Sequence, residues 1–287
     1  MITLIQLSDC HLLKDKDKAA YSGIAPYHSL ENVLQSVVAD IARGFKSVEH
    51  KHIEEAPSGK AEDEVSGEAI TNTTLLVTGD ISGDHSPESY QHFLDLMDEY
   101  IAPLNLSWFV LAGNHDNNPY FEKALGHRHL KRDKSLQFEH WHIHGMDTRV
   151  DGNTHTSGGE VSESDVQALE HALKASSTVN HVIALHHHVL PSNSWMDKHF
   201  LANAKRVVSL SERYPQVKAL IHGHVHSPLR QHIGQGATPS FGSPSTCWQW
   251  EMQQEFGVSH ELPGYQVISL FDDGGITVSI ERVALAP

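Results

Sequence analysis

The chain has 287 residues, of which 39% are hydrophobic and 20% are charged. This balance is typical of a globular protein with a sizeable core that needs no disulfide bonds. The net charge of −15 argues against a nucleic-acid groove and against binding to an anionic membrane. No apolar run approaches the roughly 20 residues that span a bilayer, and no basic, cleavable leader opens the sequence. We therefore expect one cytoplasmic domain over residues 1–287, monomeric or homodimeric, with no nucleic-acid or membrane partner.

Short apolar runs alternate along the chain with segments of helical periodicity. Five such runs predict buried strands: Ile2–Leu7, 75–78, 108–111, 182–185 and 218–221. Apolar faces predict helices around residues 30–41 and 93–101, and Ser86-Pro87 suits the start of the second. A capping box that begins at Ser162 predicts a third helix. Strands that alternate with helices imply a layered α/β domain.

The end of the chain has a different pattern. Segments 265–270 and 276–283 flank an Asp-Asp-Gly-Gly turn, which predicts a β-hairpin. Residues 138–144 predict a further strand, so we expect mixed sheets. Residues 46–72 carry almost no large apolar side chains, and we interpret them as an exposed, flexible insertion.

Five predicted strand ends carry metal-binding side chains. Each is an apolar run followed by a tight polar turn, and the ends of neighbouring strands meet in space. Asp, Asn and His together form a mixed oxygen and nitrogen ligand set, which suits two divalent transition metals held side by side. The segments are Asp9-Cys10-His11, Gly79-Asp80 with Asp84, Gly113-Asn114-His115-Asp116, His186-His187-His188 and Gly223-His224-Val225-His226.

The spacing within these segments indicates individual roles. At an extended strand end, Asp9 and His11 would point to the same side and share one metal. The two oxygens of Asp80 could bridge two metals about 3.5–4 Å apart. His115 beside Asp116 is typical of an acid/base pair, in which the carboxylate fixes the imidazole tautomer.

In this order, the five segments resemble the motif set of the calcineurin-like metallophosphoesterase superfamily. The resemblance runs from Ile5 to Val283 apart from the insertion. Within the superfamily, the chain is most similar to the bacterial class III 3′,5′-cyclic-AMP phosphodiesterases, through residues 90–93, 186–199 and 243–247. The resemblance implies the α/β/β/α sandwich of that family, with mixed sheets.

The family pattern also implies a role for each ligand-type residue. Two metals would share seven protein ligands: Asp9, His11 and His226 on one, Asn114, His187 and His224 on the other, and Asp80 bridging both. His115 would lie beside the substrate phosphate as general acid, with Asp116 behind it and Asn114 also near the substrate. Asp84 would stabilise the loop rather than bind metal.

The triple histidine leaves a choice open. The family's His-x-Pro pattern points to His187, with Val189 in the place of the proline. His186 and His188 are the alternatives, and a histidine that is not the ligand would pack or form hydrogen bonds nearby. The change to Val189 removes no ligand.

The resemblance implies a reaction as well. Two metals lower the pKa of a bridging water, and the resulting hydroxide would hydrolyse 3′,5′-cyclic AMP to 5′-AMP. Trp195 would stack on the adenine. Fe and Mn are the usual metals of the family, and Zn also suits the ligands. Alternative substrates are a 2′,3′-cyclic nucleotide, a glycerophosphodiester or a phosphomonoester. A metal-free scaffold is a remote alternative, because every ligand position holds a competent residue.

We expect the cysteines and the remaining histidine clusters to have no part in catalysis or metal binding. We expect Cys10 to pack beside the site, reduced like Cys247. The alternating His140, His142 and His144 are interpreted as exposed residues rather than ligands of a third metal.

Overall fold

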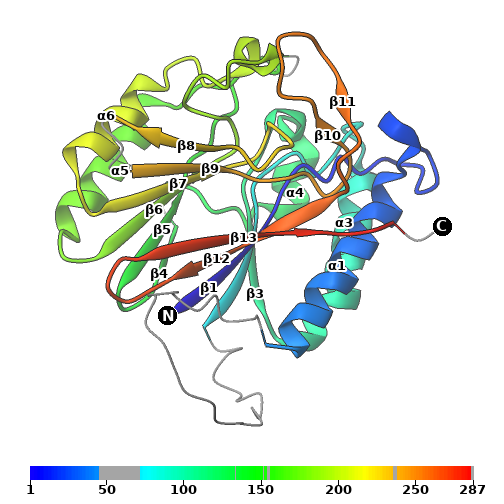
Figure 1. The fold of residues 1–287 in the computed structure, drawn as a ribbon, viewed down its shortest axis with the longest axis horizontal. Helices are drawn as coiled ribbons and strands as arrows, with labels where there is room; N and C mark the ends of the chain where they lie inside the picture. Colours follow the sequence, from blue (N-terminus) through cyan, green and yellow to red (C-terminus); the bar gives the residue numbers. More distant parts are fainter. Residues whose placement is uncertain (45–71, 133, 151, 154–155, 235–237, 286–287) are drawn as a thin grey trace, which may run out of the picture.

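The computed structural model describes residues 1–44, 72–132, 134–150, 152–153, 156–234 and 238–285 (Figure 1). These residues form two β-sheets packed face to face, with helices on the outer face of each. The predicted insertion at 46–72 lies outside the described residues, except for Asn72. Within the described ranges, no helix combines the length and apolarity needed to cross a membrane.

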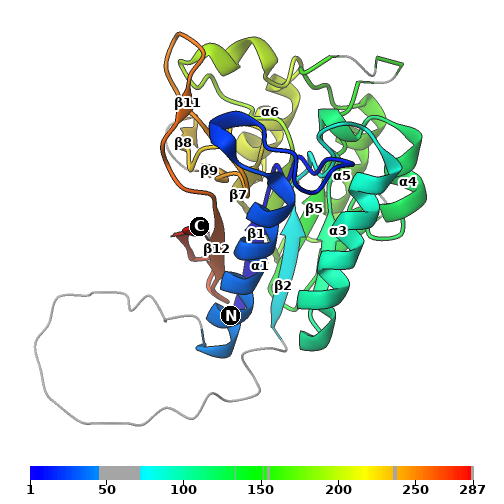
Figure 2. The ribbon, with the colours of Figure 1, turned by 90° about the vertical axis from the view of Figure 1, so that its right-hand side faces the viewer.

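The first sheet has the strand order β13-β12-β1-β2-β3. β1, β2 and β3 are parallel, and β12 and β13 add an antiparallel hairpin. Its strands are β1 (Ile2–Leu7), β2 (Thr73–Val77), β3 (Ser107–Val110), β12 (Gly264–Leu270) and β13 (Ile276–Arg282). Its outer face is covered by α1 (Pro26–Ala42), α3 (Pro87–Tyr100) and α4 (Pro119–Leu125), and Figure 2 shows α1 and α3 side by side.

The second sheet has the order β4-β5-β6-β7-β9-β8. Its four central strands are parallel, and both edges are antiparallel. The strands are β4 (Ser135–Gln137), β5 (Trp141–Gly145), β6 (Asn180–Leu185), β7 (Val217–His222), β8 (Arg230–Ile233) and β9 (Thr238–Gly242). Helices α5 (Glu163–Ala175) and α6 (Lys205–Arg213) cover it on the side away from the first sheet (Figure 1). A short ladder pairs β10 (Gln249–Trp250) with β11 (Val258–Ser259).

The sandwich core lies between the two sheets. Leu4, Leu76 and Ile268 of the first sheet pack in one buried cluster with Val182 and Ile221 of the second. Strands buried on both faces read as continuous apolar runs, which is why β1 and β2 are apolar throughout most of their length.

A buried polar contact joins the sheets just below the ligand-bearing loops. Gln6 of β1 donates from Nε2 to Thr78 Oγ1 (2.9 Å) and to the carbonyl of His222 (3.1 Å). A satisfied buried amide fixes one relative position of the strands it connects. The ends of β1, β2 and β7 are therefore held at one level.

The predicted layered α/β architecture with mixed sheets is confirmed. Ser86 and Ser162 cap their helices by accepting from the backbone N–H of Ser89 and Asp165. The strand predicted over residues 138–144 is present as β5 but begins later, at Trp141, because Phe138 lies in the turn between β4 and β5.

Candidate metal centre

The loops that follow β1, β2, β3, β6 and β7 meet at one edge of the sandwich. Backbone hydrogen bonds tie the first two together, from Asp9 N to Gly79 O (3.0 Å) and from His11 N to Asp80 O (2.9 Å). His224 N donates to both carboxylate oxygens of Asp9 (3.2 and 3.0 Å), which adds the β7 loop. The structure thus brings together all seven predicted ligands, all buried: Asp9, His11, Asp80, Asn114, His187, His224 and His226.

The backbone of these loops is left-handed at the ligand positions. Of nine described non-glycine residues with positive φ, five are predicted ligands: Asp9 (56°), His11 (48°), Asp80 (53°), His224 (67°) and His226 (45°). Such residues cost roughly 1–3 kcal/mol each and gather at functional sites. The expectation that strand alternation aligns Asp9 with His11 is wrong, because β1 ends at Leu7 and both residues lie in a turn beyond it.

The first ligand group consists of Asp9, His11 and His226. His226 Nε2 lies 3.1 Å from His11 Nε2 and 3.4 Å from Asp9 Oδ1. His226 Nδ1–H donates to the carbonyl of Trp248 (2.8 Å), so Nε2 carries the lone pair in the neutral ring. Burial lowers the pKa of His11 to about 3, which keeps that imidazole neutral.

The second ligand group consists of Asn114, His186 and His224. His186 Nε2 lies 3.2 Å from Asn114 Oδ1, and the ring of His224 is 5.1 Å from that of His186. His186 Nδ1–H donates to the carbonyl of Thr78 (2.7 Å). His224 Nε2–H donates to the carbonyl of His199 (3.0 Å), so its Nδ1 carries the lone pair. These carbonyls fix the tautomers, as partners of metal-binding histidines do.

The structure places His186 in this group beside the predicted ligand His187, because one ring nitrogen of each of His186, His187 and His224 lies within 4.8 Å of the others. The Nδ1 of His187 is hydrogen-bonded to Thr148 Oγ1 (2.7 Å), and its buried Nε2 has no hydrogen-bond partner. The ring of His187 lies 4.5 Å from that of His224, closer than the ring of His186 at 5.1 Å. The contacts to Asn114 and Asp80 belong to His186, because the residue that directly follows β6 turns its ring toward β2.

The Asp80 carboxylate lies between the two groups. Its Oδ2 is 3.7 Å from His11 Nε2 and 3.4 Å from His186 Nε2. Burial opposes ionisation of Asp80, yet the neighbouring His186 and His115 hold its pKa well below the usual range. Burial would lower the pKa of His186, but the Asp80 charge outweighs it and raises that pKa to about 9.

The donor set fits divalent cations. With its Nδ1–H on Thr78, neutral His186 presents a lone pair from Nε2 to Asn114 Oδ1 and Asp80 Oδ2, both of which are also acceptors. Lone pairs of His226 and a carboxylate oxygen of Asp9 converge in the same way. Buried acceptors that face one another need a proton or a cation between them. A mixed nitrogen and oxygen set favours transition ions.

Two glycines permit this close approach. A Cβ on Gly79, whose φ is +101°, would lie 2.5 Å from His186 Nδ1. A Cβ on Gly113 would lie 2.1 Å from Asp80 Oδ1. Any side chain at these positions would displace the central carboxylate or the histidine beside it.

His115 lies at the rim of the first ligand group. Its ring is 4.9 Å from that of His11, edge to face, and its backbone N–H donates to Asp80 Oδ1 (2.9 Å). Its Nδ1 is buried and has no hydrogen-bond partner. The imidazole is therefore close to the candidate metals without being held by a carboxylate.

Asp116 does not orient His115, contrary to the sequence-based expectation. Its oxygens accept from the backbone N–H groups of Gly113 (3.0 Å), Ile81 (3.1 Å) and Ser82 (3.2 Å), and from the hydroxyl of Tyr90 (2.9 Å). Asp116 thus joins the loops after β2 and β3. Asp84 acts similarly by accepting from Lys14 N (2.7 Å), which agrees with the predicted loop-stabilising role.

Residues 243–247 contact the turn that contains Asp9 and hold its backbone in place. Ser245 Oγ donates to the carbonyl of Asp9 (2.8 Å), and Cys247 Sγ lies 3.2 Å from the same oxygen. Cys10 and Cys247 are both free and buried, as expected. Burial raises the pKa of both thiols, so neither is a reactive thiolate.

Aromatic rings border the first ligand group. Trp248 stacks on His11 at 5.2 Å, and Trp250 stacks on His226 at 4.7 Å. Trp195, the predicted base-binding residue, packs against Trp250 at 5.6 Å, one ring further out. Trp248 and Trp250 are not among the predicted site residues, although two residues of an extended chain separated by one other point to the same side.

The sequence matches the model of the calcineurin-like phosphoesterase family over residues 2–228. The chain therefore belongs to this family of hydrolases. A relative named 3′,5′-cyclic adenosine monophosphate phosphodiesterase CpdA, from Vibrio vulnificus, is 32% identical over 99% of this chain and 90% of its own length. A 3′,5′-cyclic-nucleotide phosphodiesterase of Nostoc sp. is 36% identical over 73% of this chain and 76% of its own. A dimetal phosphatase from Danio rerio has the same fold, with a TM-score of 0.63 at 12% identity, covering 99% of both chains.

Proposed function

We propose that this protein is a dinuclear-metal phosphodiesterase that hydrolyses 3′,5′-cyclic AMP to 5′-AMP. The observation that carries the proposal is the Asp80 carboxylate, whose Oδ2 lies within 3.7 Å of His11 Nε2 and 3.4 Å of His186 Nε2. A carboxylate between two groups of lone-pair donors is suited to bridge two ions. The names of the relatives support a cyclic nucleotide as substrate.

Seven side chains would hold the ions: Asp9, His11 and His226 on one, Asn114, His186 and His224 on the other, and Asp80 on both. We propose Fe and Mn, with Zn as the alternative that the same ligands suit. When bound, the two ions would supply a water of lowered pKa and positive charge for the phosphate oxygens.

His115 is the proposed general acid. It would donate a proton to the 3′-oxygen that leaves the phosphorus, so that the product is 5′-AMP. Its Nδ1 is free of protein partners, and its backbone bond to Asp80 fixes where the ring stands relative to the bridging carboxylate. Because water attacks directly, no covalent enzyme intermediate forms.

Kinetic comparison of three substrates tests the proposal. Enzyme of known metal content is assayed on 3′,5′-cyclic AMP, 2′,3′-cyclic AMP and a glycerophosphodiester, and kcat/KM should be highest for the first. A preference for either of the other two contradicts the substrate but not the hydrolase class. Fully metal-loaded enzyme that hydrolyses none of the three contradicts the phosphodiesterase itself.

Trp195→Ala should raise KM for 3′,5′-cyclic AMP by roughly 5- to 150-fold, because stacking on a base is worth about 1–3 kcal/mol. Bis-(p-nitrophenyl) phosphate has no base, so its kinetics should not change. Trp195→Phe is the matched control and should keep most of the affinity. An equal loss on both substrates would show that Trp195 only packs against Trp250.

Metal binding should release at least one proton per chain at pH 6, the one that His186 carries. The pKa of His186, raised to about 9, keeps it protonated in the metal-free protein, whereas burial keeps the pKa values of His11 and His224 low. A group protonated below about 9 must lose its proton to bind, so affinity should rise with pH up to there and then level off. Calorimetry in two buffers of different ionisation enthalpy measures the proton count. The measurement is made at pH 6 because zinc-bound water has a pKa near 7 and would add few protons of its own there. Metal binding without proton release would contradict a protonated His186 in the metal-free protein.

A further inference from the structure

We propose that His142, His144 and His181 form a separate site for one borderline divalent transition ion, such as Zn²⁺. One ring nitrogen of each lies within 4.8 Å of the others. β5 and β6 are parallel, with His142 opposite His181, so the three side chains stand on one face of the second sheet. Only His142 is partly exposed; His144 and His181 are 7% and 0% exposed, so the interpretation of His144 as an exposed residue is wrong.

This site is distinct from the dinuclear centre. His181 lies near the start of β6, whereas His186 directly follows its last residue. Five residues of extended strand span about 16 Å, at roughly 3.3 Å per residue. The two sites therefore lie at opposite ends of the same strand and share no side chain.

The tautomer of His181 leaves a lone pair for a ligand. Its Nε2–H donates to the carbonyl of Ser176 (2.9 Å), so Nδ1 is unprotonated in the neutral ring. This Nδ1 lies 2.8 Å from His144 Nε2. A backbone carbonyl on the far nitrogen orients histidine for a metal. Burial lowers the pKa of all three imidazoles, that of His144 to about 3, so they can bind at neutral pH without losing a proton.

The dimensions need only a small adjustment. Two nitrogens on a tetrahedral zinc, each about 2.0–2.1 Å from the ion, are roughly 3.3 Å apart. Ring rotation that separates His144 from His181 by about half an ångström makes room for it. Three histidines with a water in the fourth position are an established zinc coordination, and partly exposed His142 leaves that position open to solvent.

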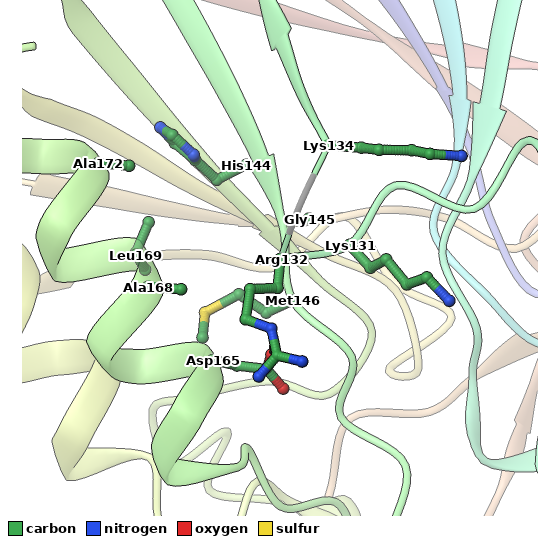
Figure 3. A pocket seen from close by; sticks show the side chains of 10 residues that line it. All are labelled: Lys131, Arg132, Lys134, His144, Gly145, Met146, Asp165, Ala168, Leu169 and Ala172. Atoms are coloured by element: carbon green, nitrogen blue, oxygen red, sulfur yellow. Dashed lines mark ion pairs between the residues drawn. The ribbon is translucent and has the colours of Figure 1, made fainter.

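The charged groups nearby have partners of their own. Figure 3 shows His144 beside Ala172 of α5, in a hollow that Arg132, Lys134 and Asp165 also line. Arg132 Nε pairs with Asp165 Oδ1 at 3.5 Å, and Lys134 Nζ donates to the carbonyl of His127 at 3.3 Å. The ion would tie β5 to β6 and, through Ser176, to the end of α5.

Metal counting on variants tests this site. Protein with its dinuclear centre loaded is equilibrated with micromolar Zn²⁺, and bound zinc is measured for wild type, His142→Gln and His140→Gln. His140 is the matched control, since it is an exposed neighbour outside the cluster. Wild type and His140→Gln should each bind one more ion than His142→Gln. Loss of a hydrogen-bond partner of a metal ligand already lowers metal affinity 10- to 100-fold, so loss of the ligand His142 itself should lower zinc affinity by at least that factor. Phosphodiesterase activity should be equal in all three.

A second measurement uses wild-type protein and spectroscopy. Co²⁺ at this site should give the absorption of a tetrahedral ion and an X-ray absorption spectrum with three imidazole ligands. Absence of the extra ion in wild type overturns the proposal, since the 2.8 Å contact would then be only a hydrogen bond between two imidazoles. An extra ion that persists in His142→Gln overturns it as well.

Discussion

His186→Gln should lose the ion of the second ligand group, whereas His187→Gln should keep both ions. His186 Nε2 faces Asn114 and Asp80, while the Nδ1 of His187 is hydrogen-bonded to Thr148. One ion supplies several kcal/mol of transition-state charge stabilisation, so kcat/KM should fall about a thousandfold or more in His186→Gln. Metal content and kcat/KM for 3′,5′-cyclic AMP are measured on the same preparations.

The two variants control for each other, because both histidines are fully buried and adjacent in sequence. A general effect of removing a buried imidazole should appear equally in both. The reverse result, with metal lost in His187→Gln and kept in His186→Gln, would restore the assignment that the family pattern suggests.

His115→Ala should lower kcat for 3′,5′-cyclic AMP by about 10²- to 10⁴-fold, the usual contribution of a general acid. The ribose 3′-oxygen is a poor leaving group and needs a proton. The p-nitrophenolate of bis-(p-nitrophenyl) phosphate is a good one, so that substrate should lose much less. A ring nitrogen of His115 lies within 4.8 Å of ligand atoms of His11 and Asp80, so metal content is measured in the variant and should remain normal if His115 is the acid and not a ligand. Equal losses on the two substrates would contradict the acid role.

Asp116→Asn separates this role from loop stability. Asp116 accepts three hydrogen bonds from the loops after β2 and β3 and a fourth from Tyr90 of α3, and no described bond joins it to the His115 ring. Its replacement should therefore lower Tm and affect both substrates alike. A leaving-group dependence like that of His115→Ala would revive the acid/base pair.

Much of the fold is readable from the sequence. Strands of parallel sheets are buried on both faces, so Ile2–Leu7 is an apolar run that ends where the polar turn begins. The strands β8 and β10 cannot be recognised as apolar runs, because they are short and carry polar residues. In β8, Arg230–Ile233, only one residue of four is buried. Their place is decided by pairing with distant strands, which local sequence does not contain.

For the candidate site too, the sequence predicts some features and not others. Ligand-type residues at strand ends can be found in the sequence, and the structure brings the seven predicted ligands together. The choice between His186 and His187 depends on which ring reaches the carbonyl of Thr78, 108 residues away. Asp116 is adjacent to His115 in sequence, yet its oxygens face the other way. Side-chain direction in a left-handed turn does not follow from residue spacing.

Because of the left-handed turns at the ligand positions, the stability of the folded protein should depend on the supply of metal. Five strained residues at roughly 1–3 kcal/mol each amount to on the order of 5–15 kcal/mol, comparable to the whole net stability of a domain. Because metal-binding free energy is also folding free energy, a cell short of metal would hold less of this protein, and not merely a less active form of it.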